Sequence, residues 1–153
     1  MSRVIFMCGP AGSGKTTYAR RLEDQGMTRL SFDGEMWRRG LTSVPLSPET
    51  RADIEVDLRA RLLQFVGDGV DVVLDFSFWS RQMRDEWRHL LEPAGVVPET
   101  IYLATDRSTV LQRVRDREGD HSDDYAIPAD LAAQYFDRFE VPTPDEGPLT
   151  VIR

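Results

Sequence analysis

The 153-residue sequence contains a single lysine, Lys15, and a single cysteine, Cys8, although it carries 18 arginines. One cysteine excludes a disulfide framework within the chain and fits a reducing compartment such as the cytoplasm. The apolar run near the start is too short for a signal peptide or a membrane span. The net charge of −7 disfavours duplex nucleic acid, which binds a basic face. We therefore expect a cytoplasmic protein with neither a membrane nor duplex nucleic acid as its partner.

Apolar runs that are typical of strands alternate with helical patterns along the chain, which predicts β-α-β units and a parallel sheet. Strands are expected at Arg3–Cys8, Thr28–Phe32, Val70–Phe76, Thr100–Ala104 and Leu149–Arg153. Helices are expected at Lys15–Asp24, after the N-cap residues Ser47 and Ser80, near Ser108–Arg117 and at Pro128–Phe139. The sequence therefore predicts one α/β domain, residues 1–153, in which helices flank a five-stranded parallel sheet.

The segment from Gly9 to Thr16, GPAGSGKT, matches the pattern G-x-x-x-x-G-K-[ST] in full and lies between a predicted strand and a predicted helix. Glycines let successive N–H groups point at phosphate oxygens, and the helix N-terminus adds a positive dipole end. Lys15 is expected to reach the β- and γ-phosphates and to be catalytic, because a compact ammonium fits inside the loop better than a guanidinium. The alternative is a glycine-rich turn with a chance Lys-Thr pair.

This P-loop predicts a nucleotide site whose residues are Gly9, Ala11, Gly12, Ser13, Gly14, Lys15, Thr16 and Thr17. The Thr16 hydroxyl is expected to bind Mg²⁺. Regulatory GTPases read guanine with an Asn/Thr-Lys-x-Asp loop, and a chain without a second lysine cannot form one. ATP is therefore the expected nucleotide.

Two carboxylates lie at the ends of predicted strands, at the edge of the sheet where open α/β proteins bind ligands. Asp75 ends the run VVLD and resembles a carboxylate that holds magnesium, directly or through water. The alternative for Asp75 is a turn residue. Asp33 follows the second predicted strand, and its alternative is a helix N-cap.

Arg113 and Arg117 lie four residues apart in a predicted helix and therefore share one face. An acidic segment with a glycine follows, and we expect residues 113–127 to form a mobile lid. Lid arginines can neutralise charge on a phosphoryl group during its transfer, so both are expected to be catalytic and to contact the nucleotide. The alternative is a solvated helix face, which we prefer for Arg115 because it points elsewhere.

Five segments, spread over nearly the whole chain, resemble the small P-loop kinases of the AAA_33 type: GPAGSGKTTYAR, SFDGEMWRRG, VVLDFSFWSRQMRDEWR, YLATDRSTVLQRVRDR and YFDRFEVPTPDEG. That group is related to the kinase domain of phage polynucleotide kinase, to chloramphenicol phosphotransferase and to zeta toxins. The resemblance implies a sheet of the nucleoside-monophosphate-kinase kind and transfer of the ATP γ-phosphate to a hydroxyl.

By position, the resemblance makes Asp33 the base that accepts the hydroxyl proton and puts Asp75 beside the magnesium or the acceptor. One departure concerns Met36, which stands where polynucleotide kinases usually have an arginine three residues after the base. The arginines come later, at Arg38 and Arg39. This departure weakens the case for a nucleic acid 5′-end as the acceptor.

The leading hypothesis is an ATP-dependent kinase that phosphorylates a hydroxyl of a small molecule such as an antibiotic, a sugar or a nucleoside. Its acceptor is expected to contact Asp33, Arg38, Asp75, Ser77, Arg81 and Arg84. The alternatives are a nucleic acid 5′-end kinase, a zeta-toxin-like kinase and, from another class, an ATP-hydrolysing switch or interaction module. The segment Phe139–Gly147 either closes over the adenine or pins the C-terminal end. The sequence leaves the acceptor and the oligomeric state open.

Overall fold

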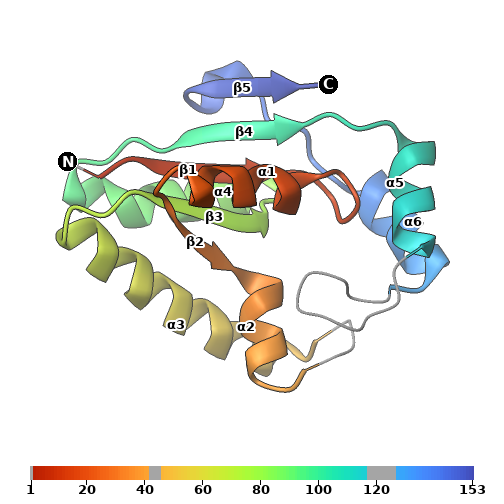
Figure 1. Cartoon of the computed structure of the whole chain (residues 1–153), viewed down its shortest axis with the longest axis horizontal. Coiled ribbons are helices and arrows are strands. Elements are labelled where there is room, and N and C mark those ends of the chain that lie inside the picture. The colour runs from red at the N-terminus through yellow and green to blue at the C-terminus, as the bar shows by residue number, and fades with distance from the viewer. Residues whose placement is uncertain (1, 42–45, 117–126) are drawn as a thin grey trace.

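The structure, a computed structural model, describes residues 2–41, 46–116 and 127–153 as a sheet with helices on both of its faces (Figure 1). The strands are β1 (Val4–Cys8), β2 (Thr28–Ser31), β3 (Val72–Ser77), β4 (Glu99–Leu103) and β5 (Leu149–Ile152). The helices are α1 (Lys15–Asp24), α2 (Phe32–Arg38), α3 (Pro48–Gly67), α4 (Arg81–Leu91), α5 (Arg107–Arg115) and α6 (Ala129–Asp137). Short 3₁₀ turns lie at Glu92–Ala94 and Pro144–Glu146.

The five strands form one parallel sheet in the order β2-β3-β1-β4-β5, which confirms the predicted fold class. The central strand β1 is fully buried and pairs with β3 on one side and β4 on the other. The chain order of the strands therefore reverses at β1. In open parallel sheets, this reversal opens a crevice at the carboxyl ends of the strands, where ligands bind.

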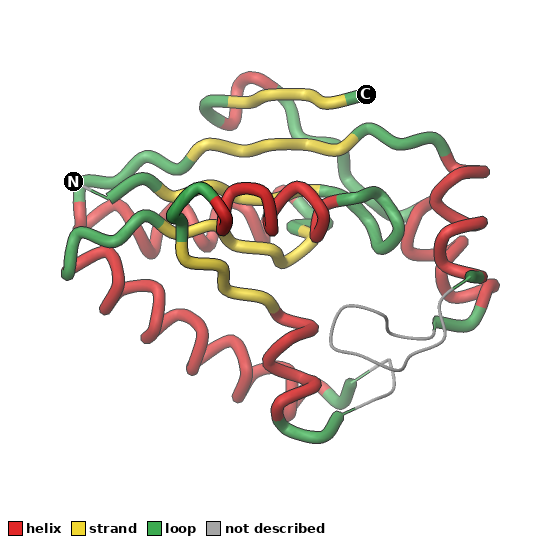
Figure 2. Tube along the Cα trace, viewed as in Figure 1, coloured by secondary structure: helices red, strands yellow, loops and turns green. Residues whose placement is uncertain are grey.

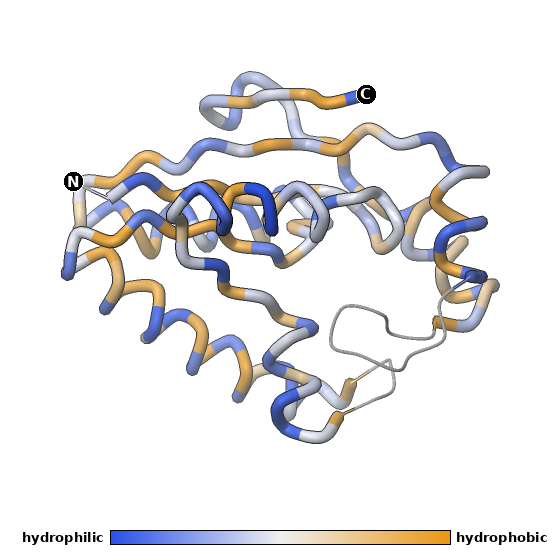
Figure 3. Tube along the Cα trace, viewed as in Figure 1, coloured by the Kyte–Doolittle hydropathy of each residue, from blue (hydrophilic) through white to orange (hydrophobic). Residues whose placement is uncertain are grey.

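Alternate residues of β1 face two separate apolar layers, because side chains along a strand point to opposite faces. Val4 and Phe6 belong to the layer under α2, α3 and α4, whereas Ile5 and Met7 belong to the layer under α1. Apolar residues lie along the strands, while charged and apolar residues alternate along α3 (Figure 3). The sheet is thus a rigid base from which its strand ends present polar residues.

Helices α3 and α4 begin where the sequence predicts, directly after Ser47 and Ser80. The Ser47 hydroxyl accepts a hydrogen bond from the Thr50 N–H (3.2 Å), and the Ser80 hydroxyl accepts one from the Met83 N–H (3.1 Å). The inward residues of α3 and α4 are fully or almost fully buried: Ile54, Leu58, Leu62, Met83, Trp87 and Leu91. Within the described parts of the chain, no helix has the length and apolar character needed to cross a bilayer.

Candidate functional site

The glycine loop runs from the end of β1 to the start of α1, as the motif requires (Figure 2). Gly12 has φ +88°, and a Cβ placed there would lie 2.7 Å from the Val110 carbonyl oxygen of α5. Gly14 has φ +96° and caps α1 without a side chain, so the first N–H groups of this helix remain open to a ligand. Only glycine satisfies both positions, and the loop is a P-loop rather than a chance turn.

The Lys15 side chain is buried, with 6% of its surface exposed, yet it has no hydrogen bond or ion pair to any residue the structure describes. The ammonium is not among the buried polar atoms that lack a partner, so it opens into the space around it and can bind an anion there. Lys15 borders two cavities, one of about 780 Å³ and one of about 1010 Å³. The position therefore suits an anionic ligand that lies across both cavities, such as a polyphosphate.

The larger of these, the glycine-loop cavity, is lined by the loop, by the first turn of α1 and by Arg113 of α5. The Arg113 guanidinium donates a hydrogen bond from Nη1 to the Gly12 carbonyl oxygen (3.1 Å). Arg113 therefore lies against the loop where the nucleotide is expected. Arg115 is exposed and donates to Gln112 Oε1 (2.9 Å), so it points away from this cavity. Arg117 and most of the predicted lid, residues 113–127, lie outside the described residues and stay predictions.

Asp75 lies at the end of the buried strand β3, beside the P-loop threonine. Its Oδ2 accepts hydrogen bonds from the Thr16 hydroxyl (3.0 Å) and from Arg29 Nη2 (2.8 Å). Its Oδ1 is buried and has no hydrogen-bond partner among the described residues. A hydroxyl beside a carboxylate with an unused oxygen is the donor set that Mg²⁺ accepts in nucleotide sites. Thr16 and Asp75 therefore fit the predicted magnesium site.

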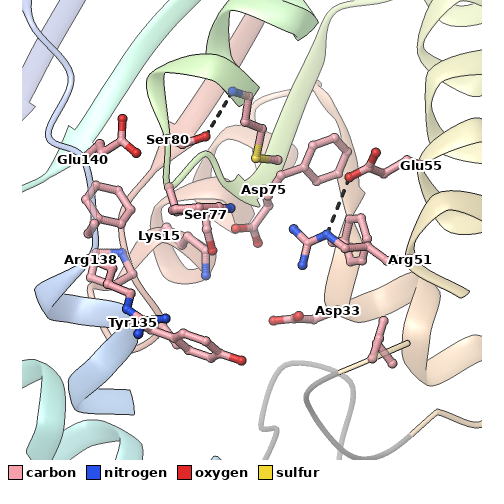
Figure 4. A pocket seen from close by; sticks show the side chains of 18 of the residues that line it. Lys15, Asp33, Arg51, Glu55, Asp75, Ser77, Ser80, Tyr135, Arg138 and Glu140 are labelled. Carbon is pink, nitrogen blue, oxygen red and sulfur yellow. Dashed lines mark hydrogen bonds and ion pairs between the residues drawn. The ribbon is translucent and has the colours of Figure 1, made fainter. Parts of the chain in front are cut away.

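Asp33 lines the smaller cavity together with Lys15, Asp75 and Ser77 (Figure 4). We call this space the Asp33 cavity. The second strand ends at Ser31, one residue earlier than predicted, and the Ser31 hydroxyl accepts from the Gly34 N–H (3.0 Å). Ser31 is therefore the N-cap of α2, and the alternative that Asp33 serves as the cap is wrong. Asp33 lies in the first turn of α2, where its carboxylate borders the cavity.

The helix that carries Asp33 is anchored by the buried carboxylate of Glu35. Arg39 Nε donates to Glu35 Oε1 (3.0 Å) and Arg61 Nη1 of α3 donates to Oε2 (3.3 Å), while Arg38 forms a further ion pair with the same group. The hydrogen bonds from Arg38 and Arg39 outweigh burial and lower the pKa of Glu35 to about 2. The ion pair with Arg61 ties α2 to α3.

Three arginines that the sequence assigned to the acceptor do not line the Asp33 cavity. Arg38 is largely exposed and pairs with Glu35. Arg81 pairs with Asp145 (3.1 Å). Arg84 is fully buried and pairs with Glu146 (2.8 Å). Each of these arginines pairs with a carboxylate that lies close to it in space. The position of an arginine in a sequence motif therefore does not show where its side chain points.

The structure adds residues to the Asp33 cavity, and two of them, Tyr135 and Arg138, come from a helix that was not predicted to line it. Arg51 enters from the first turns of α3, and Tyr135 and Arg138 enter from the C-terminal half of α6 and its cap (Figure 4). Arg51 lies 3.6 Å from Glu55, whereas Arg138 forms no ion pair with any described residue. No local pattern marks α6, because only the fold brings it opposite α2.

The segment from Phe139 to Gly147 pins the C-terminal part of the chain to the sheet. The Glu140 N–H donates to the Trp79 carbonyl oxygen (2.8 Å), and Glu146 pairs with Arg84 and Arg88. None of the segment lines the glycine-loop cavity. These contacts favour the pinning role over closure on the adenine.

Comparisons with known proteins agree with this geometry. The model of the AAA_33 family, described as an AAA domain, matches residues 4–142. A Schizosaccharomyces pombe protein named "Probable gluconokinase" is 28% identical over 97% of this chain and 78% of its own length.

Two solved structures share the fold over nearly the whole chain. A sugar kinase from Janibacter sp. HTCC2649 is 25% identical, with a TM-score of 0.70 over 99% of this chain and 85% of that protein. A gluconokinase from Sinorhizobium meliloti 1021 is 21% identical, with a TM-score of 0.70 over 98% and 81% of the two chains. The chain belongs to the AAA_33 family and is an ATP-dependent kinase of the small P-loop type.

Proposed function

We propose that this kinase transfers the γ-phosphate of ATP to a hydroxyl of a sugar or a sugar acid. One observation carries the proposal: the ammonium of Lys15, on a buried stem and without a described partner, faces the same cavity as the carboxylates of Asp33 and Asp75. A phosphate-binding cation beside a potential base is what phosphoryl transfer to an alcohol requires. The relatives named as gluconokinases and a sugar kinase support a sugar-type acceptor over an antibiotic or a nucleoside.

In the proposed reaction, Lys15 binds the phosphates of ATP from the floor of both cavities. Asp33 accepts the proton of the acceptor hydroxyl while its oxygen forms a bond to the γ-phosphorus. The bond from that phosphorus to the bridging oxygen breaks, and ADP leaves. Thr16 and Asp75 would hold Mg²⁺, which neutralises phosphate charge when bound. Arg113, held on the Gly12 carbonyl oxygen, adds positive charge on the nucleotide side.

The acceptor side also bears on the alternatives. Met36 is buried and lines the Asp33 cavity, where the related polynucleotide kinases usually have an arginine. An apolar side chain there gives a nucleic acid end no charged contact. A cavity of about 780 Å³ has room for a small acceptor, which a bare ATP-hydrolysing switch does not need.

A single-domain, cytoplasmic kinase with a lid at residues 113–127 completes the proposal, and a free, buried Cys8 suits a reducing compartment.

The test is a phosphorylation assay with purified protein, ATP and Mg²⁺. The acceptor panel contains D-gluconate, other aldonic acids, neutral sugars, nucleosides, aminosugars and a 5′-hydroxyl oligonucleotide. Mass spectrometry identifies the product, and ADP formation gives the rate. We expect a phosphorylated sugar or sugar acid with wild-type protein and almost none with Asp33→Asn. ADP without any phosphorylated product, or a labelled oligonucleotide, would overturn the proposal in favour of a switch or an end kinase. Growth arrest on expression would point to a toxin.

A further inference from the structure

A strained turn lies directly after β3, at the wall of the Asp33 cavity. Ser77 has φ +70° and Phe78 has φ +52°, and these are the non-glycine residues with positive φ in the described parts of the chain. A left-handed conformation costs an L-residue roughly 1–2 kcal/mol, because Cβ approaches the following carbonyl oxygen. Such conformations persist only where the surroundings hold them.

The turn decides which side chains reach the cavity. Phe78 is fully buried and stacks on Phe6, with ring centroids 4.2 Å apart. Ser77 and Trp79 line the Asp33 cavity on either side of it, and Trp79 is 44% exposed. The Gly9 N–H also donates to the Ser77 carbonyl oxygen (2.9 Å), so the turn is joined to the start of the P-loop.

A buried ion pair holds the turn from behind. Arg84 Nη1 donates a hydrogen bond to the Phe78 carbonyl oxygen (2.7 Å), and Arg84 Nε donates to Glu146 Oε1 (2.8 Å). The Arg84 and Glu146 side chains are 1% and 2% exposed, so water cannot replace either contact. Glu146 is fixed in turn by the Thr143 N–H, which donates to its Oε2 (2.8 Å). The C-terminal segment that contains Thr143 and Glu146 thus holds Arg84 in place behind the turn.

We propose that Arg84 and Glu146 are positioning residues for the acceptor: they hold the left-handed turn at Ser77–Phe78 and so keep Ser77 and Trp79 on the cavity wall. Arg84 acts through the Phe78 carbonyl oxygen and does not touch the acceptor. Without that hydrogen bond, the turn relaxes toward the ordinary extended conformation, and the wall moves. The assignment of this wall to the acceptor rests on the proposed function, whereas the coupling between the ion pair and the turn does not.

The test compares Arg84→Met with Arg88→Met. Arg88 pairs with the same Glu146 oxygen (3.3 Å), but its other hydrogen bonds go to Thr100 Oγ1 (3.2 Å) and Asp85 Oδ1 (3.2 Å) and not to the turn. Both variants remove one arginine and leave Glu146 paired with the other. Backbone NMR chemical shifts of Ser77 and Phe78 report the turn without any substrate. Steady-state kinetics with D-gluconate and ATP give the KM for the acceptor, which rises if Ser77 and Trp79 move from the cavity wall.

We expect Arg84→Met to lose the left-handed shifts of Ser77 and Phe78 and to raise the KM for D-gluconate about tenfold, in line with the cost of one such residue. The Kd for ATP and kcat should stay close to wild type. Arg88→Met should keep the shifts and the KM and lower only stability. Left-handed shifts that survive in Arg84→Met would overturn the inference, as would equal KM increases in both variants.

If Arg84→Met does not fold, Glu146→Gln gives the same test with a smaller change. Its amide oxygen still accepts from Arg84, so the expected shift changes and KM increase are in the same direction but weaker. Unchanged shifts in Glu146→Gln, together with an unchanged KM, would count against the role of the pair. Wild-type protein that phosphorylates no sugar or sugar acid counts against the proposed function alone, because the NMR comparison needs no acceptor.

Discussion

The two cavities that meet at Lys15 are built in different ways. About half of the residues that line the glycine-loop cavity come from one continuous stretch, Gly12–Arg21, whose open backbone N–H groups are expected to bind phosphate together with Lys15. The Asp33 cavity is lined by side chains from α2, α3, α4, α6 and the end of β3, together with the glycine loop and Lys15 of α1. A site formed largely by backbone groups is specified by local sequence. It binds phosphate, the group that ATP supplies in every kinase reaction. A site made of side chains depends on tertiary packing and can differ between relatives.

Lys15→Ala should impair the function of both cavities, because Lys15 is the residue that they share. We expect phosphotransfer to fall by about 10³-fold or more, since a charge-stabilising group is lost from the phosphates. Calorimetric titration should show greatly weakened ATP binding. The melting temperature should not fall, because Lys15 has no described partner to lose. Near-native ATP affinity would contradict the nucleotide-site assignment.

Asp33→Asn should separate the contributions of the two cavities to activity, because it changes only the acceptor side. General-base catalysis is typically worth about 10²–10⁴ in rate, and asparagine cannot accept the proton. We expect phosphotransfer to fall by that factor while the Kd for ATP and the melting temperature stay unchanged. The cap of α2 is Ser31, so no stability loss from the helix end is expected. A variant with nearly full activity would move the base to Asp75.

Arg113→Ala should damage the nucleotide side and leave acceptor binding intact. Its guanidinium lies on the Gly12 carbonyl oxygen, beside the phosphates that ATP would place there. A hydrogen bond to a charged group is worth about 1.5–3 kcal/mol, so kcat/KM for ATP should fall roughly 10- to 100-fold, mainly through kcat. Arg115→Ala is the matched control, because Arg115 bonds only to Gln112 of its own helix among the described residues. Greater damage from Arg115→Ala would reverse the assignment of the helix faces.

The same contrast explains how much could be predicted from the sequence. The P-loop, the five parallel strands and the N-caps of α3 and α4 follow from local sequence patterns, and the structure has them where they were expected. Three of the arginines that the sequence assigned to the acceptor do not line the Asp33 cavity, because a guanidinium reaches several residues away and the fold decides its partner. Arg84 shows this best, since Glu146, 62 residues later, takes it out of the site. Tyr135 and Arg138 were missed because no sequence pattern near them indicates that α6 borders the same cavity as α2.

The anchor of the Asp33 helix gives the smallest expected effect, and it depends on pH. Glu35 has an ordinary pKa of 4.5 in the unfolded chain and a pKa lowered to about 2 in the fold. A lowered carboxylate pKa stabilises the fold wherever the unfolded carboxylate is also charged, which is above pH 4.5. As the pH falls from 4.5 toward 2, the unfolded state takes up the proton first, and this stabilisation is lost.

Glu35→Gln should therefore cost about 2 kcal/mol of unfolding free energy at pH 7, the value of hydrogen bonds to a charged group, and progressively less as the pH falls below 4.5. Urea unfolding of both proteins at pH 7, 5, 4 and 3 measures the difference. Glu146, whose burial is outweighed by hydrogen bonds that lower its pKa to about 2, titrates in the same window and is present in both proteins, so its contribution cancels. The variant should also raise the KM for the acceptor, because Arg61 no longer ties α2 to α3 and Asp33 moves with its helix. A difference that is equal at every pH would mean that the Glu35 carboxylate packs without its charge being used, and α2 would then be held by its apolar contacts alone.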